Sequence, residues 1–389
     1  MAIPFEYNLR NVMNRPVSTF TTALGIGLTV AIFIGALALA AGFRAALVST
    51  GRDDNAIVLR KGADSEISSG LSRDQVQILR ASPEIAAGPD GRPLVTADLV
   101  VVTNKDRKGQ AGSSNIIVRG VDPQAGAVRG NIKLIAGRTF TPGTDEVIVG
   151  RRIAPRFKDC NVGDRIRFQQ RDFTVVGHFS AGGSAFESEV WGDVEVLAPA
   201  LQRSNTFQTV VFRMQDPAQL AALKTRVEAD PRLQAQVLSE RDFFMRQSES
   251  FTTLITVLGT FITLIMGVGA LFGAANTMFA AIGARSREIA TLLVLGFSPA
   301  SVMLAFVVES VLIAAIGGAL GILMALPVNG ITSSTTNFSS FSELAFQFTV
   351  TPEAMASGMI FALVLGLVGG FFPALHASRQ SLSAALRGG

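Results

Sequence analysis

Four long stretches of this chain carry almost no charge, and they constrain its fold more than any other feature. Residues 16–43 hold no charged residue over about 28 positions, whereas about 20 apolar residues in a helix cross the hydrocarbon core of a bilayer. Residues 250–284 and 354–375 are likewise uncharged, and residues 298–326 contain Glu309 as their single charge. We therefore expect four transmembrane helices.

The composition agrees with a membrane protein. Hydrophobic residues make up 48% of the 389 positions and charged residues only 16%. The net charge is +4, but no dense run of Lys and Arg with interleaved aromatic residues occurs, so we expect no nucleic-acid partner. Cys160 is the single cysteine, which excludes an internal disulfide and a Cys-based zinc site, and we interpret it as a buried, unreactive thiol.

The flanks of the four stretches predict their orientation, because Lys and Arg accumulate on the cytoplasmic side. The flanking basic residues are Arg10, Arg15, Arg285, Arg287, Arg379 and Arg387. Residues 327–351 contain neither Lys nor Arg. We expect a multi-pass protein of the bacterial inner membrane with both termini in the cytoplasm and the large domain in the periplasm. Because the chain begins with Met1, we expect the first span to be an uncleaved anchor.

This topology divides the chain into nine segments. They are an amphipathic cytoplasmic helix at 1–15, spans at 16–43, 250–284, 298–326 and 354–375, a periplasmic domain at 44–249, a cytoplasmic coupling helix at 285–297, a periplasmic loop at 327–353, and a cytoplasmic tail at 376–389. As one helix, residues 250–284 would extend about 50 Å, so we expect this span to project from the membrane as a stalk.

Residues 44–249 have the mixed charge of a soluble domain inserted between the first two spans. Short β-branched or alternating runs predict strands at 56–60, 94–103, 115–120, 146–150, 165–169, 173–176 and 209–212. Helices are predicted at 72–81, with Ser72 as N-cap, and at 217–229, with Asp216 as N-cap. We expect a two-lobed α+β extracytoplasmic domain: an α+β lobe assembled from both ends and a β-rich lobe inserted into it.

Two short segments on the cytoplasmic side are expected to be helical. Before the first span, Phe5, Leu9, Val12 and Met13 fall on one helix face, which favours a helix in the membrane interface or a flank that anchors the span. Residues 285–297 are charged at their start and end at a glycine, which favours a helix that docks on a partner. The alternative is a positive-inside anchor followed by the beginning of a core helix.

Several phrases together identify a family. In the second half of the chain they are Arg285-Ser-Arg-Glu-Ile289, Gly296, Glu309-Ser310, Gly317-Gly-Ala-Leu-Gly321, Pro373-Ala-Leu-His-Ala-Ser-Arg379 and Ala385-Leu-Arg387. In the inserted domain they are Gly137-Arg-Thr-Phe140, Glu146-Val-Ile-Val-Gly150, Val162-Gly-Asp164 and Phe173-Thr-Val-Val-Gly177. This combination resembles the macrolide-exporter/FtsX-like (MacB-type, type VII) ABC transporter permease family over nearly the whole chain.

The resemblance implies partners and a mode of action. It implies a homodimer or close heterodimer of permeases, two copies of an ABC ATPase subunit, contact with membrane lipids and, in some systems, a periplasmic adaptor and an outer-membrane channel. It also implies that the ATPase contacts the cytoplasmic segment, at Arg285, Arg287, Glu288, Ile289 and Gly296. In such a system ATP hydrolysis moves the long helices, and the periplasmic domain follows.

The chain has no sequence feature of an enzyme. No Gly-x-x-x-x-Gly-Lys-Ser/Thr phosphate loop occurs, so we expect ATP and Mg to be bound by the partner ATPase and no cofactor by this chain. His178 and His376 belong to no metal or nucleophile arrangement, so we expect no catalytic residue and no metal.

Three further sets of residues inside or beside the spans are candidate sites. Glu309 is an intramembrane carboxyl, for which we favour a hydrogen bond to a neighbouring helix over a proton or substrate site. Glycines at four-residue spacing that permit close helix packing are Gly269, Gly273, Gly317, Gly321, Gly366 and Gly370. Phenylalanines that either contact lipid or an amphiphilic cargo, or fill the interface, are Phe338, Phe341, Phe346 and Phe348.

The expected function is that of a permease subunit that couples ATP hydrolysis to periplasmic conformational change. The substrate class expected for export or extraction is hydrophobic or amphiphilic, such as a lipid, lipopeptide or drug. The alternative is a non-transporting, FtsX-like signal relay that activates an extracytoplasmic partner such as a cell-wall hydrolase.

Overall fold

The computed structural model describes residues 5–109 and 111–379, which form two compact units. The first, here called the helical unit, comprises the described residues within Met1–Ala41, Thr253–Ile331 and Phe348–Gly389. The second, here called the sheet unit, comprises Gly42–Thr252 and Thr332–Gln347.

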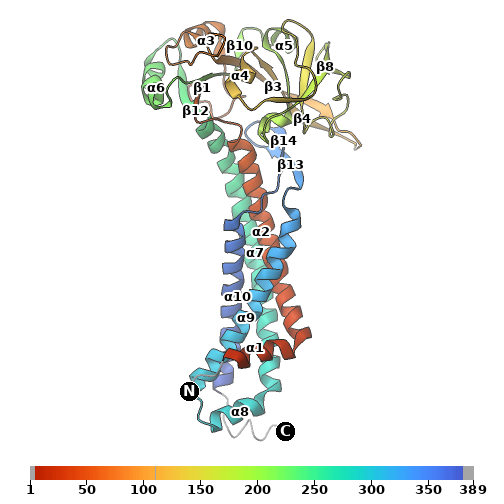
Figure 1. Ribbon diagram of the computed structural model, residues 1–389, viewed down its shortest axis with the longest axis vertical. Helices are drawn as coiled ribbons and strands as arrows, with labels where there is room; N and C mark the ends of the chain where they lie inside the picture. The colour runs from red at the N-terminus through yellow and green to blue at the C-terminus, as the bar shows by residue number, and fades with distance from the viewer. Residues whose placement is uncertain (1–4, 110, 380–389) are drawn as a thin grey trace. The chain divides into compact units, whose positions relative to one another are not determined.

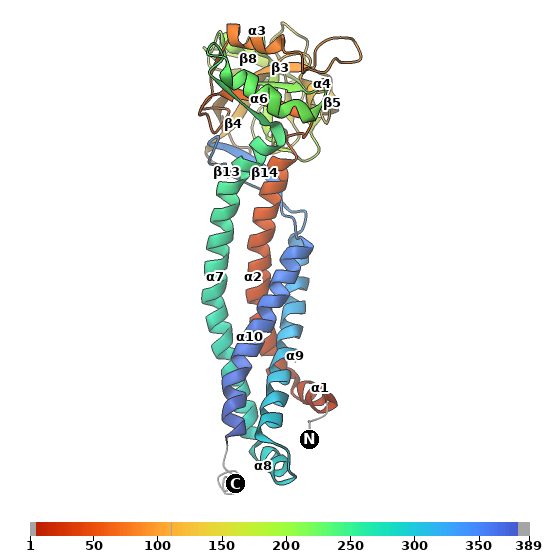
Figure 2. The same cartoon turned by 90° about the vertical axis from the view of Figure 1, so that its left-hand side faces the viewer.

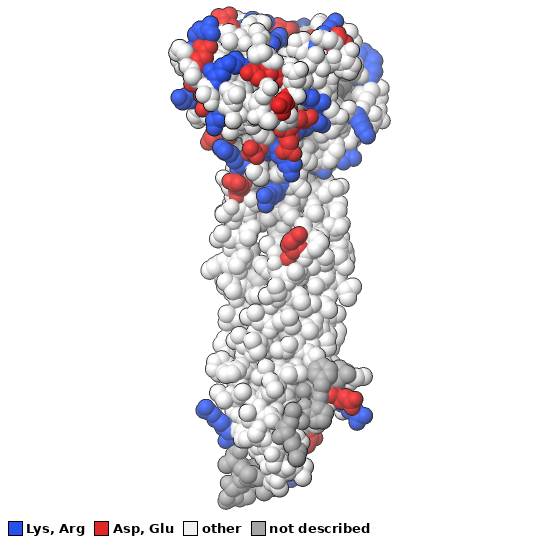
Figure 3. All heavy atoms as spheres, turned by 60° about the vertical axis from the view of Figure 1, so that its left-hand side comes forward, with Lys and Arg blue, Asp and Glu red and all other residues white. Residues whose placement is uncertain are grey.

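Four long helices run side by side in the helical unit (Figures 1 and 2). They are α2 (Pro16–Val48), α7 (Glu240–Ala284), α9 (Pro299–Ala325) and α10 (Pro352–Ser378). Among the described residues these helices, with η3 (Leu326–Val328) extending α9, are long and apolar enough to cross a membrane. The face of this unit drawn in Figure 3 carries almost no charged side chain over its middle. The short helices α1 (Phe5–Asn14) and α8 (Ser286–Val294) complete the unit.

Local signals explain where some of these helices begin. Ser298 accepts a hydrogen bond from the Ser301 backbone N–H ahead of Pro299, and Thr351 accepts one from Ala354 ahead of Pro352. The helices also extend beyond the uncharged stretches of the sequence: α7 begins at Glu240, well before residue 250. Apolar length identifies the part of a helix that suits lipid, whereas the helix itself continues for as long as its backbone stays hydrogen-bonded.

Pro373 does not end the fourth long helix, because α10 continues past it to Ser378. Proline removes one backbone hydrogen bond and usually kinks or ends a helix in water. Helices that pack against neighbours in a membrane protein tolerate it better. Pro373 is buried within α10, which packs along α9.

Glycines let α9 approach its neighbours closely. A Cβ atom on Gly321 would stand 2.7 Å from the Gly27 carbonyl oxygen of α2. On the other side of α9, a Cβ on Gly366 of α10 would stand 2.3 Å from Ala314 Cβ, and one on Gly370 would stand 2.4 Å from Ser310 Cβ. These contacts are shorter than real Cβ atoms adopt, so the backbone approach depends on glycine.

Gly269 and Gly273 of α7 differ, because a Cβ on either would meet nothing within 4 Å. They border a hollow of about 350 Å³ between α2 and α7. Its other lining residues are Thr21, Thr22, Gly25, Thr29, Ala270, Ala274 and Thr277.

The sheet unit is built on a ten-stranded sheet in the order β12-β1-β11-β3-β4-β9-β6-β8-β5, with β7 paired to β8. The strands are β1 (Asn55–Arg60), β3 (Val95–Asp106), β4 (Ser113–Val121), β5 (Lys133–Gly137), β6 (Glu146–Gly150), β7 (Arg165–Phe168), β8 (Arg171–Ser180), β9 (Glu189–Asp193), β11 (Thr209–Arg213) and β12 (Ala235–Ser239). The pairs β4–β9 and β6–β8 are parallel, and the others are antiparallel. A two-stranded pair joins β2 (Leu71–Ser72) to β10 (Thr206–Phe207).

All seven predicted strands form, with ends that differ by a few residues. Both predicted helices form as well: α3 (Arg73–Arg80) starts at Ser72 with a capping box to Gln75, and η2 (Pro217–Gln219) with α6 (Leu220–Ala229) starts at Asp216. The remaining helices of the unit are α4 (Ala125–Arg129), α5 (Val194–Ala200) and η1 (Ala185–Ser188).

One strand joins the two parts of the domain that we expected as lobes. Strands from the two ends of the insert do lie together as β12-β1-β11-β3. However, β3 pairs with β11 through Val95–Asp98 and with β4 through Leu99–Asp106, so one long strand continues the sheet into the β-rich part. A single hydrophobic core runs through both parts, from Val58 to Phe173.

The sheet unit also contains a hairpin that no sequence pattern predicted. Strands β13 (Thr332–Asn337) and β14 (Ser342–Gln347) pair in antiparallel register, with Ser334 opposite Ala345. The hairpin lies in the segment between α9 and α10, which we had expected to be a loop. The alternation of β13 is made of Ser and Thr rather than of apolar residues, and therefore carries no hydrophobic period.

Candidate functional site

A network of buried charges lies within the sheet unit and is centred on Arg119 of β4. The Arg119 guanidinium donates to both carboxylate oxygens of Glu66, at 2.7 and 2.9 Å. It also donates to both oxygens of Glu189 on β9, at 2.7 and 2.9 Å, and Nη1 lies 3.2 Å from Asp98 Oδ2 on β3. Bidentate pairs fix orientation as well as distance, so Arg119 ties two neighbouring strands to the 61–70 loop.

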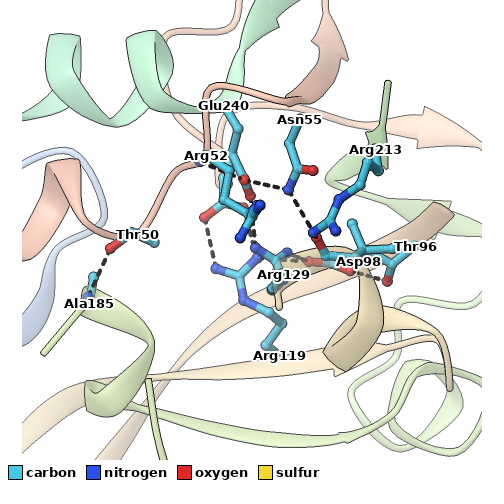
Figure 4. Close-up of polar contacts among 12 residues, drawn as sticks. Thr50, Arg52, Asn55, Thr96, Asp98, Arg119, Arg129, Ala185, Arg213 and Glu240 are labelled. Carbon is cyan, nitrogen blue, oxygen red and sulfur yellow. Dashed lines mark hydrogen bonds and ion pairs between the residues drawn. The ribbon is translucent and has the colours of Figure 1, made fainter. Parts of the chain in front are cut away.

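A second buried arginine connects this network to the first residue of α7. Arg129, at the end of α4, donates from Nη1 to Glu240 Oε1 at 3.0 Å and pairs with Asp98 (Figure 4). Its guanidinium lies 4.2 Å from the ring centroid of Phe186 and 5.6 Å from that of Trp191. Aromatic faces thus enclose the arginine, and Asp98 bridges it to Arg119.

The loop that follows α2 meets the same carboxylate. The backbone N–H of Arg52 and the amide of Asn55 donate to Glu240 Oε2, at 3.2 and 2.8 Å (Figure 4). Beside them Thr50 Oγ1 accepts a hydrogen bond from the Ala185 backbone N–H at 2.8 Å. Glu240 therefore joins the chain leaving α2 to the chain entering α7.

The network contains more carboxylates than guanidiniums. Its buried members are Glu66, Asp98, Arg119, Arg129, Glu189 and Glu240. Burial by itself would lower the pKa of Arg119, but the charges of Glu189 and Glu66 outweigh burial and hold that pKa well above its ordinary value. Both arginines are required to neutralise the buried carboxylates, because removing either leaves carboxylates without a counter-charge. Such an arrangement suits mechanical fastening better than catalysis.

The helical unit contains a second buried ion pair. Arg285 precedes α8, and its Nη1 lies 3.1 Å from Oε2 of Glu309 in α9, with each side chain 6% exposed. Two residues that the sequence analysis assigned to different sites are thus partners. We had favoured a hydrogen bond from Glu309 to a neighbouring helix; its partner instead lies in the turn between α7 and α8. Arg285 is unsuited to contact another protein directly because it is buried.

The remaining residues of the expected ATPase contact divide between surface and interior. Arg287 and Glu288 are exposed on α8, and Tyr7 of α1 donates to Glu288 Oε2 at 3.4 Å. Ile289 is buried against Met278 and Phe306, so it is a core residue of the helical unit rather than a contact residue. Gly296 has φ +91, a left-handed conformation that ends the segment and favours glycine.

The four phenylalanines of the 327–353 segment differ in their exposure. Phe338 and Phe341 are exposed near the tip of the hairpin. Phe346 is buried, with its ring centroid 5.9 Å from that of Phe43, so it fills the core and is unavailable to cargo or lipid. Phe348 lies outside the hairpin and is partly buried.

Some predicted residues lie at the ends of the described chain. In α1, Val12 is buried in contact with Ala23 and Ile313, while Met13 is exposed. The side chains of Phe5 and Leu9 and the tail residues 385–387 lie outside the described residues. Among the described residues, no group of three or more His, Cys, Asp or Glu side chains is arranged to hold a metal ion.

The apolar helices and the folded sheet unit fit one class of protein, a helical membrane protein with a separate folded domain. Residues 19–230 match the family described as MacB-like periplasmic core domain, and residues 251–382 match the family described as FtsX-like permease C-terminal. The first match alone covers more than half of the chain. This chain therefore belongs to the MacB-like, FtsX-like family of ABC transporter permeases, which confirms the resemblance and indicates an inner-membrane protein with a periplasmic domain.

Two relatives match most of this chain. The macrolide export ATP-binding/permease protein MacB 1 of Aeromonas hydrophila is 26% identical over 330 residues, covering 79% of this chain and 48% of that protein. The macrolide export ATP-binding/permease protein MacB of Bordetella avium is 25% identical over 388 residues, covering 93% of this chain and 56% of that protein. The chain thus spans about half the length of the curated relatives it matches.

Two solved structures resemble part of this chain more distantly. One is the extracellular domain of the noncanonic ABC-type transporter YknZ from Gram-positive bacteria, with 14% identity and a TM-score of 0.35 over 47% of this chain and 99% of that chain. The other is the periplasmic region of MacB from Actinobacillus actinomycetemcomitans, with 14% identity and a TM-score of 0.37 over 53% of this chain and 94% of that chain.

Proposed function

We propose that this chain is a permease subunit that transmits ATP-driven motion to its periplasmic domain and thereby exports or extracts a hydrophobic or amphiphilic substrate. The observation that carries the proposal is that buried ion pairs lie at both ends of α7. At its first residue, Glu240 is held by Arg129, Asn55 and the Arg52 backbone. Directly after its last residue, Arg285 is paired with Glu309.

A continuous helix fastened at both ends suits the transmission of displacement. The 45 residues of α7 form one helix, so a push or rotation applied near Arg285 is not absorbed by a break along its length. A buried, multiply hydrogen-bonded carboxylate at the other end resists being pulled out, because its release would expose uncompensated charges. In this proposal α8 receives the displacement, and Glu240 passes it to the sheet.

The partners follow from the same proposal. Two copies of an ABC ATPase bind ATP and Mg, this chain contributes no nucleotide chemistry, and the ATPase contacts Arg287 and Glu288 on α8. A second permease, identical or closely related, completes the assembly, with an adaptor and outer-membrane channel in systems that export. Both termini lie in the cytoplasm.

Co-purification with the cognate ATPase tests the docking step. We expect Glu288→Lys to abolish recovery of the complex and stimulation of ATP hydrolysis, because it reverses an exposed charge at the start of α8. Membrane insertion should be unchanged. Glu353→Lys is the matched control, since Glu353, like Glu288, is an exposed acid in the first turn of its helix. Normal complex formation by the Glu288→Lys protein would refute the docking role of α8.

A second assay distinguishes a transporter from a signal relay. The complex is reconstituted and its ATPase activity measured with a panel of lipids, lipopeptides and drugs. A transporter of amphiphilic cargo responds to some of these compounds and moves them, whereas a signal relay responds to none and instead activates an extracytoplasmic enzyme.

A further inference from the structure

A hollow lined by three arginines lies in the sheet unit, and none of the carboxylates or arginines of the buried network lines it. It has a volume of about 600 Å³ and is bordered on one side by the turn that follows β6 and on the other by the β13–β14 hairpin. Its lining residues are Arg151, Arg152, Pro155, Arg156, Thr332, Ser333, Ser334 and Gln347. The lining therefore contains three positive side chains, several hydroxyls and no acidic group.

The carboxylates that form ion pairs with these arginines are buried. Glu187 Oε2 is 2.7 Å from Arg151 Nε and 3.2 Å from Arg152 Nε. Glu187 also accepts hydrogen bonds from the backbone N–H groups of Ala181 and Gly183, both at 2.9 Å, which fixes its position. One carboxylate thus orients two guanidiniums.

A second carboxylate is shared in the same way. Glu343 of β14 pairs with Arg156 and lies 2.5 Å from Arg107. Arg156 also donates to the Ser334 hydroxyl, and Arg152 donates to the Ala345 carbonyl. Four guanidiniums therefore share two carboxylates, which leaves an excess of positive charge beside the hollow.

Two of the arginines that carry this excess charge are partly shielded from water. Burial lowers the pKa of Arg152, and the neighbouring Arg151 charge lowers it further. Burial and the Arg107 charge lower the pKa of Arg156 in the same way. Each shift means that its guanidinium would be stabilised by a further negative charge, and the open side of the hollow is where an anion can approach.

The donor set selects the chemical class of the anion. Planar guanidiniums match the oxygens of phosphate, and hydroxyls supply additional donors that suit a tetrahedral group. Three residues separate Val328, at the end of the third candidate span, from Thr332 at the start of β13, and four separate Gln347 from Pro352, at the start of the fourth. We propose that the hollow between Arg151, Arg152, Arg156 and the hairpin hydroxyls binds a phosphate group, carried by a phospholipid headgroup or present as free phosphate.

The full-length chain, purified in dodecyl maltoside and stripped of lipid, allows a direct test by isothermal titration calorimetry at low salt. The probes are dihexanoyl phosphatidylglycerol, the matching dihexanoylglycerol without phosphate, and inorganic phosphate. We expect saturable binding of a phosphate-bearing probe and none of dihexanoylglycerol. Binding of the lipid alone assigns the site to a headgroup, and equal binding of inorganic phosphate assigns it to the free ion.

Two variants localise the binding. Arg151→Gln removes the most exposed of the three charges, with 43% of its side chain accessible, and should weaken binding about tenfold. Ser333→Glu places a carboxylate in the hollow without removing an ion pair and should abolish binding. Arg171→Gln is the matched control, because Arg171 is 46% exposed, is paired with Asp145 and does not line the hollow.

Folding is monitored through the fluorescence of Trp191, the single tryptophan, and only variants with an unchanged unfolding transition are compared. The absence of saturable binding by the wild-type chain would overturn the proposal. So would wild-type affinity in both Arg151→Gln and Ser333→Glu. The test requires no ATPase, so the proposal stands or fails independently of the permease function.

Discussion

Arg129 and Glu240 form a buried ion pair, 3.0 Å from Nη1 to Oε1, that links the end of α4 to the first residue of a 45-residue helix. Neither side chain is more than 2% exposed. Ion pairs at such depth add little net stability when intact, yet they are costly to break from one side. The pair therefore resists separation of α4 from the start of α7 more than it adds to the net stability of the fold.

Glu240→Ala should destabilise the sheet unit by about 3–5 kcal/mol, because it leaves Arg129 with one counter-charge fewer and removes acceptors from Asn55 and the Arg52 backbone. Arg241→Ala, at the next position, breaks only the exposed pair with Asp53 and should cost at most about 1 kcal/mol. Denaturant titration followed by Trp191 fluorescence compares the two. Equal losses would show that the network is not a special fastening.

The Arg285–Glu309 pair predicts strong coupling between two substitutions. Arg285→Gln and Glu309→Gln should each lower the melting temperature of the full chain in detergent, since each removes one partner of a buried pair. The double variant should be more stable than the sum of the single losses implies, by about 0.5–3 kcal/mol. Additive losses would mean that the two side chains do not depend on each other.

Two glycines in long helices should respond oppositely to the same substitution. Gly366→Ala forces a Cβ to within 2.3 Å of Ala314 Cβ and should separate α10 from α9, lowering the melting temperature. Gly273→Ala meets nothing within 4 Å and should be neutral or stabilising by up to about 1 kcal/mol, through helix propensity. The measurement is thermal unfolding of the single chain in detergent. A harmless Gly366→Ala would contradict the observed α9–α10 packing.

Cys160 should be inert to thiol reagents. Burial raises the pKa of its thiol to about 11, so on the order of 10⁻³ of it is thiolate at pH 8, and the side chain is buried as well. Maleimide labelling at pH 8 should therefore fail on the folded chain and proceed after denaturation. Rapid labelling of the folded protein would disprove this placement. If Cys160 is silent, single cysteines introduced elsewhere can report membrane sidedness without background.

Local sequence patterns predicted individual strands and helices better than the pairing between them. The strands at 56–60 and 146–150 were predicted because their apolar runs are bounded by turn residues, and Ser72 was predicted because a helix N-cap is a short-range signal. Nothing local indicated that β3 would pair with both β11 and β4, because strand pairing is decided by contacts far apart in the chain. The sequence patterns therefore did not predict that one strand joins the two expected lobes.

The candidate sites show the same division. Glu309 drew attention as a charge within an apolar stretch, and Arg285 as a basic flank, but only folding brought them to 3.1 Å across 24 positions of sequence. Phe346 and Phe338 looked equivalent in sequence, and the pairing of β13 with β14 buried one and exposed the other.

By itself, the sequence determined that the described part of this protein has four helices long and apolar enough to span a membrane, and which family the chain belongs to, because hydrophobic length and family-typical motifs are properties of contiguous residues. The tertiary structure alone decided which charges are buried together around Glu240, and that the segment between α9 and α10 closes the arginine-lined hollow with a hairpin. Those arrangements join residues more than a hundred positions apart, and their energies depend on burial, which no local pattern of residues encodes.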